Sequence, residues 1–522
     1  MKRRSFLGSV TAVLAGGTLS AGTVPARLWA QAPPVADSGP AAPAAAAPFG
    51  FEDVARIAAD LARAAYVAPD SRLQAPFADL GYDAYRGIRF RREADPWAAV
   101  DGFGLDLLAP GMLFTDPVRI NLVEEGVVRN LPFDPSVFEY HPNSFPPDAG
   151  QTPPGNMGWS GFRLRTVLNR PGVLDELAVF QGASYFRVLG RGNRYGLSAR
   201  GLAIGTGSAA GEEFPAFREF WIHSPTDGAV TIHALLDSPS VAGAFQFVLT
   251  PGDTTVVATR VALFPRRDLA EVGIAPLTSM FWFGPGDRGN FDDYRPAVHD
   301  SDGLEMVTGG GEHLWRALSN PRTLQISAFA DRDPRGFGLM QRRRDFADYQ
   351  DAEASYELRP SGWVRPRGEW GEGTVVLVEI PVTNEFHDNI VSYWQPAQPL
   401  AAGMRHDYAY DLGFGMAPGD EYPVARVVQS RSGEAINAPG ARSFFVDFDL
   451  ELFEGQADPV AVVSASAGRI EHPYVIRLPQ AGVMRLSFQF DPERADLAEL
   501  SARLESGDTR MSETWLYRWS RG

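Results

Sequence analysis

The chain has 522 residues, a formal net charge of −16 and no cysteine. This length exceeds one ordinary domain and allows a large core, while the lack of cysteine excludes disulfides and thiolate metal sites. An acidic surface argues against nucleic acid and an anionic membrane as partners, and it suits a neutral substrate such as a glycan. The 53 Gly, 41 Pro and 33 Phe favour strands joined by frequent turns.

The N-terminal residues predict export. Residues 2–7, KRRSFL, form a twin-arginine signature, and the apolar run at 10–19 is too short to span a membrane. Residues 1–30 are therefore expected to be a twin-arginine signal peptide, with Ala30 and Ala32 as alternative cleavage positions and the periplasm as destination. Residues 31–48 are rich in Ala and Pro and are expected to form a disordered leader.

Residues 49–395 are predicted to form a large β-sandwich. Apolar residues recur at helical spacing at 51–66, and a second, shorter helix is expected near Phe77. Strand patterns dominate after that, and no helices alternate with strands, which argues against a doubly wound fold. The clearest strand patterns lie at 178–189, where a glycine separates two strands, and at 229–236, 245–249, 254–263, 323–329 and 374–380.

A second β block is predicted after the Pro-rich stretch at 396–404, which is interpreted as a linker. Short strand patterns follow within 405–522, at 407–412, 443–448, 460–463 and 483–490. About 120 residues of short strands suit a small immunoglobulin-like β-sandwich. The run at 460–463 is continuously apolar, as in a strand buried on both faces.

Several familiar site motifs are incomplete. The GWSGF at 158–162 lacks the last glycine of a nucleophile elbow, and 190–196 is one residue too long for a dinucleotide-binding loop. The DSDG at 300–303 resembles half a calcium loop, but its first and twelfth positions would be Val298 and Gly309, which supply no carboxylate. We therefore expect neither a cofactor nor a metal.

The segment 384–394, NEFHDNIVSYW, is the strongest candidate for a site. It places Glu385, Asp388 and Trp394 close to the predicted seam between the two β blocks, where concave sites tend to form. Aromatic rings can cover the C–H faces of a sugar, and a carboxylic acid can protonate a glycosidic oxygen. The alternative is that Asp388 belongs to a plain turn and Trp394 only packs.

Two further segments carry acids and rings. In the loop at 292–304, Arg295 would lower the pKa of a nearby carboxylate, whereas burial would raise it, and the sequence does not decide between the two effects. The segment 336–351 is rich in charges and rings and leads to Tyr356 and Trp363. It is interpreted either as a mobile lid or as a loop that wraps the surface.

Eight segments carry a resemblance to a known family: 80–90, 182–187, 194–203, 211–215, 295–296, 299–304, 336–339 and 388–391. They run in order along about two-thirds of the mature chain, and the long ones are specific. In these segments the chain resembles the osmoregulated periplasmic glucan biosynthesis proteins of the G and D branches. The twin-arginine leader favours the D branch.

This resemblance implies a galactose-mutarotase-like sandwich followed by an immunoglobulin-like one, acting on β-1,2-glucan. Asp388 matches the general acid, and Asp300 the general base, of the anomer-inverting β-1,2-glucanases of this family. The resemblance implies that the acid relays its proton through a substrate hydroxyl and that the base acts through a water chain. Tyr356 and Glu385 match residues that line the reaction path. An inverting mechanism needs one protonated and one ionised carboxyl group with room for water.

Two departures from the family keep three hypotheses open. Phe386 and His387 replace residues that are often small or polar, and QRRR at 341–344 is more basic than usual. We expect an endo-acting hydrolase; the alternatives are a transglycosylase or cyclising enzyme on the same glucan, and a non-catalytic glucan-binding assembly factor. Trp363, Trp394 and Arg295 are candidate substrate contacts. Neither nucleic acid nor stable membrane insertion is expected, and a homodimer is kept as a candidate assembly.

Overall fold

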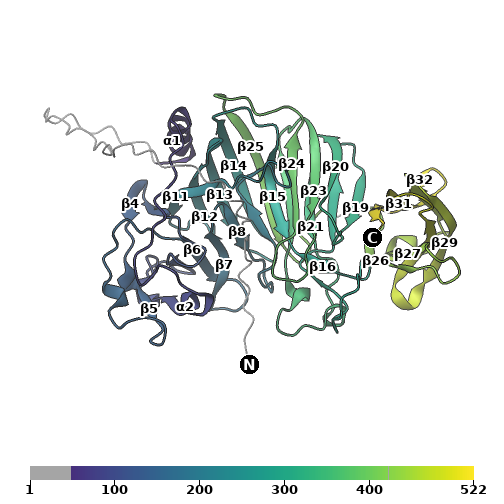
Figure 1. The fold of residues 1–522 in the computed structure, drawn as a ribbon, viewed down its shortest axis with the longest axis horizontal. Coiled ribbons are helices and arrows are strands. Elements are labelled where there is room, and N and C mark those ends of the chain that lie inside the picture. The colour runs from purple at the N-terminus through teal and green to yellow at the C-terminus, as the bar shows by residue number, and fades with distance from the viewer. Residues whose placement is uncertain (1–48, 421–422, 522) are drawn as a thin grey trace.

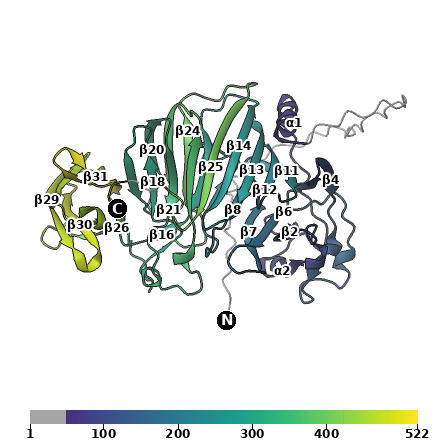
Figure 2. The ribbon, with the colours of Figure 1, turned by 180° about the vertical axis from the view of Figure 1, so that it is seen from behind.

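The computed structural model describes residues 49–420 and 423–521, so the predicted signal peptide and leader lie outside the described residues. Within these ranges the regular structure is almost entirely β, and the all-β prediction is confirmed. Figures 1 and 2 show long strands in two layers, helix α1 near one edge and the C-terminal strands at the opposite end. The likeness to galactose mutarotase stays a prediction.

The first large sheet has ten strands, in the order β2-β6-β7-β8-β9-β15-β24-β23-β20, with β10 beside β15. Its members are β2 (Phe103–Leu108), β6 (Gly161–Val167), β7 (Leu174–Gln181), β8 (Tyr185–Val188), β9 (Ser198–Arg200), β10 (Ala203–Ile204), β15 (Val272–Ser279), β20 (Gln325–Arg332), β23 (Glu372–Glu379) and β24 (Ile390–Pro396). Their antiparallel pairing lets segments far apart in sequence meet at one end of the sheet.

The second large sheet has fifteen strands, in the order β28-β31-β33-β19-β18-β21-β22-β25-β14-β13-β12-β11-β3-β4, with β32 beside β31. Its members are β3 (Arg119–Glu124), β4 (Val127–Leu131), β11 (Ala216–His223), β12 (Val230–Asp237), β13 (Val241–Thr250), β14 (Thr255–Pro265), β18 (Gly303–Val307), β19 (His313–Ala317), β21 (Gly336–Met340), β22 (Ser361–Arg367), β25 (His406–Gly415), β28 (Val460–Ala465), β31 (Leu497–Ser506), β32 (Thr509–Arg510) and β33 (Thr514–Ser520).

The core of the large body lies between these two sheets. Phe162 of the first sheet meets Phe220 of the second with ring centroids 5.0 Å apart, and Phe180 meets Phe247 at 5.5 Å. All four side chains are buried. Burying one such side chain contributes about 1.5–3 kcal/mol, so the aromatic layer holds the sheets together and fixes the strands that carry the site.

Helix α1 (Phe51–Arg63) covers the outer face of the second sheet. Its Phe51, Val54 and Ala58 are buried in one cluster with Trp221 of β11. The helix ends earlier than the predicted 66, because the backbone is already extended at residue 64. The short helix α2 (Tyr82–Arg86) begins later than the one predicted near residue 77. Two small ladders join β1 (Ile88–Phe90) to β5 (Phe138–Tyr140) and β16 (Phe281–Phe283) to β17 (Val298–His299).

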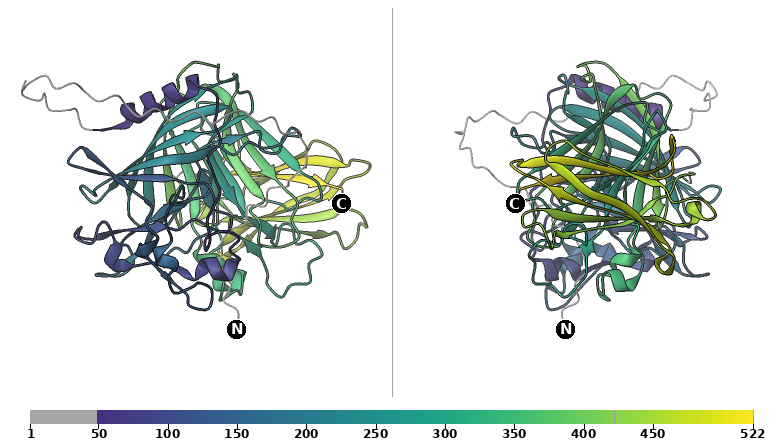
Figure 3. Two further views of the ribbon diagram at one scale, coloured as in Figure 1. Left: turned by 60° about the vertical axis from the view of Figure 1, so that its left-hand side comes forward. Right: turned by 90° about the vertical axis from the view of Figure 1, so that its right-hand side faces the viewer.

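The C-terminal strands form a second sandwich that shares a sheet with the large body. A four-stranded sheet of β26 (Val427–Glu434), β27 (Arg442–Asp449), β30 (Val483–Asp491) and β29 (Arg469–Leu478) packs on β28, β31 and β33. Its core includes Phe444 and Phe488, with stacked rings 5.2 Å apart. Because β33 pairs in parallel with β19, the second large sheet continues into this sandwich, seen end-on in Figure 3.

Three predictions about the C-terminal block are wrong. Strand β25, assigned from sequence to that block, pairs with β14 and β22 and therefore belongs to the large body. The stretch 396–404 connects a strand of the first sheet to a strand of the second, because Pro and Gly mark tight connections as readily as linkers. Strand β28 is an edge strand whose Val460 is 65% exposed, so it is not buried on both faces.

Candidate active site

One short segment of backbone supports both predicted catalytic carboxylates. The N–H of Asp300 donates to the carbonyl of Met280 at 2.8 Å. The N–H of Asn389, next to Asp388, donates to the carbonyl of Ser279 at 3.0 Å. Pairing of β16 with β17, and of β15 with β24, thus brings together two loops that lie far apart in the sequence.

The side-chain amide of Asn389 fixes the loop that carries Asp388. Its Nδ2 donates to the carbonyls of Phe281 (3.0 Å) and Ile380 (2.9 Å), and its Oδ1 accepts from the N–H of Phe281 (2.8 Å). Asn389 is fully buried. A buried amide that uses its donors and its acceptor in this way holds the backbone in one place, so the end of the loop is rigidly attached to β16.

Asp300 is a buried carboxylate with a dedicated cation. It is 2% exposed and forms an ion pair with Arg359, whose guanidinium lies 4.2 Å from the ring centroid of Tyr356. Burial raises the pKa of Asp300, the charge of Arg359 opposes this rise, and the negative charge of Asp388 adds to it. The two carboxylates are therefore close enough to interact electrostatically.

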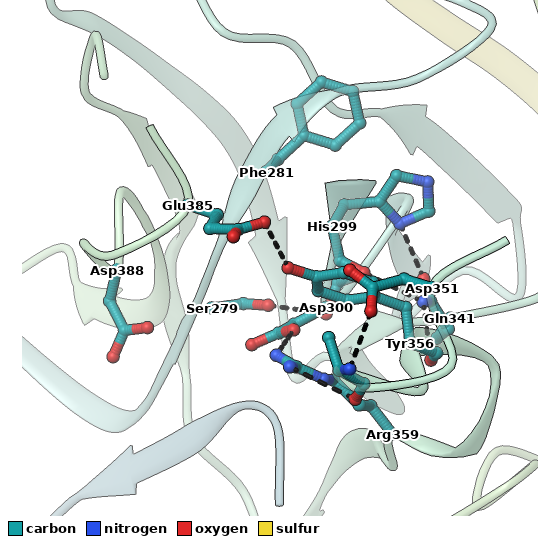
Figure 4. Close-up of polar contacts among 12 residues, drawn as sticks. Ser279, Phe281, His299, Asp300, Gln341, Asp351, Tyr356, Arg359, Glu385 and Asp388 are labelled. Atoms are coloured by element: carbon teal, nitrogen blue, oxygen red, sulfur yellow. Dashed lines mark hydrogen bonds and ion pairs between the residues drawn. The ribbon is translucent and has the colours of Figure 1, made fainter. Parts of the chain in front are cut away.

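Asp388 has a much more open environment. Its side chain is 23% exposed, and its Oδ2 lies 3.9 Å from Nη2 of Arg187 on β8. The Nε of Arg187 donates to the hydroxyl of Ser198 at 2.7 Å. Figure 4 shows Asp388 set apart from the hydrogen-bonded group around Asp300 and Arg359. Solvent and a bound substrate can therefore reach Asp388 directly.

Glu385 and Tyr356 form a buried pair beside Asp300. The hydroxyl of Tyr356 donates to Oε2 of Glu385 at 2.9 Å, and Nη1 of Arg295 donates to the same oxygen at 2.6 Å. Burial raises the pKa of Tyr356 far above its usual value, so the phenol keeps its proton at neutral pH. Glu385 is thus an ion-paired acceptor, and Figure 4 shows the pair adjacent to Asp300.

Arg295 joins three carboxylates. Besides Glu385, its guanidinium contacts Asp293 and Asp351, each at 2.8 Å. Burial raises the pKa of Asp351, but the N–H groups of Ala354 and Glu353 and the guanidinium outweigh it, so this pKa is lowered overall. The hydrogen bonds from Arg295 also lower the pKa of Asp293. Arg295 therefore anchors three loops by ion pairing.

His299 stays neutral beside the candidate base. Its Nδ1 hydrogen-bonds to Oε1 of Gln341 at 2.8 Å, and its ring stacks on Phe281 at 5.3 Å. Burial lowers the pKa of His299 to about 3. Gln341 also donates to the carbonyls of His299 and Tyr356, so it joins the two segments that flank Asp300.

A cavity of about 540 Å³ opens next to this network. Its volume lies in the range of ordinary ligand sites. Glu385 and Arg295 belong to its wall, whereas Asp300 and Asp388 do not. Its other lining residues are Trp282, Asp293, Tyr294, Gln350, Asp351, Ala352, Glu353, Asn384 and Phe386. Tyr294 is 77% exposed and Phe386 is 48% exposed, so both offer free ring surface to a ligand.

Two predicted substrate contacts are wrong. Trp394 is completely buried in the core of the large body, and Trp363 is 2% exposed in the core shared with the C-terminal sandwich. Neither ring has a free face for a sugar. The sequence identified the residue type but not the side of the strand on which each ring lies. The exposed rings at the cavity are Tyr294 and Phe386, both in segments that the sequence analysis singled out.

The basic run at 342–344 makes ion pairs and hydrogen bonds within the fold. Arg342 pairs with Glu305 and Glu513, each at 2.7 Å, and so connects the two sandwiches. Arg343 pairs with Asp348, and Arg344 donates to backbone carbonyls, among them that of Met416 at 2.8 Å. The segment 336–351 is therefore held by strand β21 and these pairs, as in a loop that wraps the surface.

Three residues of the site were missed by sequence reasoning: Arg359, Arg187 and Asn389. Each acts through a partner that is distant in sequence or through the backbone, so its role has no local signal. Arg187 and Asn389 do lie in segments that carry the family resemblance. That position was the only sequence signal for them.

The site carboxylates are paired with arginines. Across 49–420 and 423–521, no group of three or more metal-ligating side chains is placed to hold a metal ion. In the same part of the chain, no helix is both long and apolar enough to cross a membrane.

Comparisons with known proteins identify the family. The family model "Periplasmic glucan biosynthesis protein, MdoG" matches residues 49–519. Glucans biosynthesis protein G of Vibrio cholerae serotype O1 (strain O395) is 47% identical over 483 residues, covering 90% of this chain and 87% of the relative. Glucans biosynthesis protein G of Shewanella baltica (strain OS195) is 47% identical over 480 residues with the same coverage, and protein G 1 of Shewanella oneidensis is 46% identical. The chain belongs to the periplasmic glucan biosynthesis protein family.

Proposed function

We propose that this protein is a periplasmic glycoside hydrolase that cleaves β-1,2-glucan endo-wise with inversion of the anomeric carbon. Asp388 is the general acid and Asp300 the general base. One observation carries the proposal: two loops, one bearing Asp300 and one bearing Asp388, are hydrogen-bonded to the same backbone segment at residues 279–280, beside a ligand-sized cavity. An inverting mechanism needs one protonated and one ionised carboxyl group, and the family resemblance assigns these roles to Asp388 and Asp300 respectively.

The acid role suits the accessible carboxylate. When protonated, Asp388 donates to the leaving glycosidic oxygen, directly or through a substrate hydroxyl. Because its side chain is partly exposed, it regains a proton from solvent after each turnover. Asn389 keeps this carboxylate in a fixed position relative to β16. This fixed geometry reduces the orientational entropy lost in the transition state.

The base role suits the buried carboxylate. An ionised Asp300 accepts the proton that the attacking water loses, and Arg359 stabilises the ionised form. Asp300 does not line the cavity, so the proton must pass through intermediate groups. The Tyr356 hydroxyl and water molecules in the cavity are suitable carriers, since Tyr356 packs against Arg359 and hydrogen-bonds to Glu385.

One feature favours transglycosylation as the second candidate. Phe386 exposes half of its ring at the cavity wall, where the family often has a small or polar residue. An apolar ring at that place can exclude water, so that a sugar hydroxyl attacks instead. The basic run at 342–344, by contrast, gives this alternative no support, because its side chains are engaged in structural contacts.

The remaining parts of the proposal concern location and branch. We propose export by the twin-arginine leader at 2–7 and membership of the D branch, which that leader favours. The relatives named above carry the G designation.

Fusing residues 1–30 to a reporter that is active only after folded export tests the leader. Replacing Arg3 and Arg4 by Lys should abolish export, and unaffected export would contradict it.

The activity is tested by incubating residues 31–522 with linear β-1,2-glucan and measuring reducing ends together with product masses. Hydrolysis predicts rising reducing ends and shorter chains. Redistribution of mass without new ends, or products lighter by one water, would replace hydrolysis by transfer or cyclisation. Unchanged glucan that still binds would make the protein a binding factor.

A further inference from the structure

The cavity beside Glu385 combines exposed rings with a strongly negative wall. Four carboxylates line it, those of Asp293, Asp351, Glu353 and Glu385, against a single guanidinium, that of Arg295. That guanidinium forms ion pairs with three of the four acids, Asp293, Asp351 and Glu385. The cavity therefore presents no free positive charge to a ligand, and its potential is negative.

The rings of the same cavity suit a sugar. Tyr294 and Phe386 expose apolar surface, and the loops that carry them are fixed. The N–H of Phe386 donates to Oδ1 of Asn384 at 3.0 Å, and the N–H of Arg295, next to Tyr294, donates to Oδ1 of Asp293 at 2.9 Å. Exposed aromatic rings offer apolar area to a ligand.

The third ring of the wall adds an unused donor. Trp282 packs on Phe283 and Phe291, with ring centroids 5.0 Å away in each case. Its buried Nε1–H has no acceptor among the residues that the structure describes. A hydroxyl-bearing ligand can supply that acceptor after a small ring movement, whereas the acidic side chains of the wall already serve Arg295 and the backbone.

We infer that this cavity is a subsite that selects uncharged glucan units and rejects glucan carrying anionic substituents. This inference rests on the proposed function, since it assumes that the adjacent carboxylates act on glucan. The physical cause is repulsion between the carboxylates of the wall and an anionic group on the sugar. Such like-charge contact mainly suppresses wrong ligands, and salt screens it.

The test uses the Asp388→Asn variant, which we expect to bind glucan without cleaving it. Calorimetry compares neutral linear β-1,2-glucan with carboxymethylated glucan of the same length, at low and at high salt. We expect the neutral chain to bind at least about tenfold more tightly at low salt, with a smaller ratio at high salt. Equal affinity at low salt, or tighter binding of the anionic chain, would overturn the inference while leaving the proposed function intact.

A charge reversal localises the effect. Glu353 is an exposed acid of the wall, so Glu353→Lys should strengthen binding of the carboxymethylated chain and reduce the affinity ratio several-fold. Asp508→Lys, in the exposed turn between β31 and β32, makes the same change in net charge far along the chain and should leave the ratio unchanged. Equal effects of the two variants would assign the selectivity to net charge and refute the subsite. Failure of the neutral glucan to bind would refute the inference and the proposed function together.

Discussion

The two candidate catalytic carboxylates differ in almost every physical respect. Asp300 is 2% exposed and is paired with Arg359 in a protein-only environment. Asp388 has a side chain that is 23% exposed, with Arg187 at 3.9 Å. Burying a charge is costly unless a partner compensates for it, whereas a partly exposed charge is stabilised by water.

This contrast assigns different tasks to the two regions. The fold completes the environment of Asp300 before any ligand arrives, and this fixes its protonation behaviour. The environment of Asp388 is completed only when a substrate replaces solvent around it. Variants should therefore affect the two regions differently: changes near Asp300 should alter folding stability, and changes at Asp388 should alter turnover with little effect on stability.

The largest expected effect is on turnover. Asp388→Asn removes the proton donor, and we expect kcat to fall by about a thousandfold while glucan affinity and thermal stability stay close to those of the parent. Reducing-end assays, calorimetry and thermal unfolding measure the three quantities. Asp292→Asn, an exposed acid outside the cavity wall, is the matched control. A kcat equal to that of the parent would remove Asp388 from the mechanism.

Next in size is the loss of the buried cation. Arg359→Met leaves Asp300 buried without its partner, and we expect the free energy of unfolding in urea to fall by about 3–5 kcal/mol. Arg187→Met, at the exposed carboxylate, should cost less than about 1 kcal/mol. Adding Asp300→Asn to Arg359→Met should recover part of the loss. Equal losses for the two arginine variants would contradict the comparison.

Fixed positioning of the acid should have an intermediate effect. Asn389→Ala removes three side-chain hydrogen bonds, and we expect kcat to fall by about 10–100-fold with KM within about twofold, because the acid is misplaced rather than lost. Asn130→Ala removes an amide with hydrogen bonds on β4 and should leave kcat unchanged. A parallel loss in both variants, or a change in KM alone, would refute a positioning role.

The pH dependence separates activity from stability. The folded chain keeps the proton of Asp300 to a higher pH than the unfolded chain does, so turnover should fall as pH drops through this raised pKa, above the ordinary 3.8. The free energy of unfolding should change the opposite way over the same interval, decreasing as pH rises, because there the folded state binds more protons. Profiles of kcat/KM and of urea unfolding, with Asp300→Asn as reference, measure both.

The His299→Gln variant tests which group causes the loss of turnover on the acidic side of the pH profile. Since the pKa of His299 is lowered to about 3, this side chain stays neutral wherever the enzyme works, and that side of the profile should keep its position. The contribution of His299 to the free energy of unfolding has the opposite sign to that of Asp300: it is lost as pH drops from 6.5 towards 3, where the unfolded chain binds the extra proton. The difference in unfolding free energy between the parent and His299→Gln measures this contribution. If the acidic side of the kcat/KM profile shifts in His299→Gln, the loss of turnover at low pH belongs to His299 and not to Asp300.

The smallest expected effect concerns the exposed ring. Tyr294→Ala should raise KM several-fold with kcat nearly unchanged, consistent with a contact of about 1 kcal/mol. Trp394→Phe should leave KM unchanged and lower stability, because that ring is in the core. Steady-state kinetics of both variants decide the matter, and an increase in KM for the buried ring alone would reverse the assignment.

The fold was predictable where local pattern determines it. Helical spacing located α1, and alternation with Gly and Pro located strands such as β12 and β23. The domain boundary was not predictable, because the Pro-rich stretch at 396–404 has the same composition as a linker while connecting two strands of one body. Val460 is exposed because β28 forms the edge of its sheet, and the residues of a strand do not determine whether that strand lies at an edge.

The candidate site was predictable only through family resemblance. Composition and motifs indicated carboxylates and rings near a seam, and the roles of Asp300 and Asp388 came from the matching segments. The pairing of Asp300 with Arg359 depends on a contact between loops 59 residues apart, so no local pattern reveals it. The burial of Trp394 follows from packing between sheets, which residue type alone does not specify.

The anomeric form of the first product tests the central claim most directly. Proton NMR during the first minutes of glucan cleavage, before the new ends equilibrate, reports the configuration at each released reducing end. An inverting pair of Asp388 and Asp300 predicts that the α-anomer appears first from the β-linked chain. Initial release of the β-anomer, or cleavage without any new reducing end, would contradict the assignment of these two carboxylates.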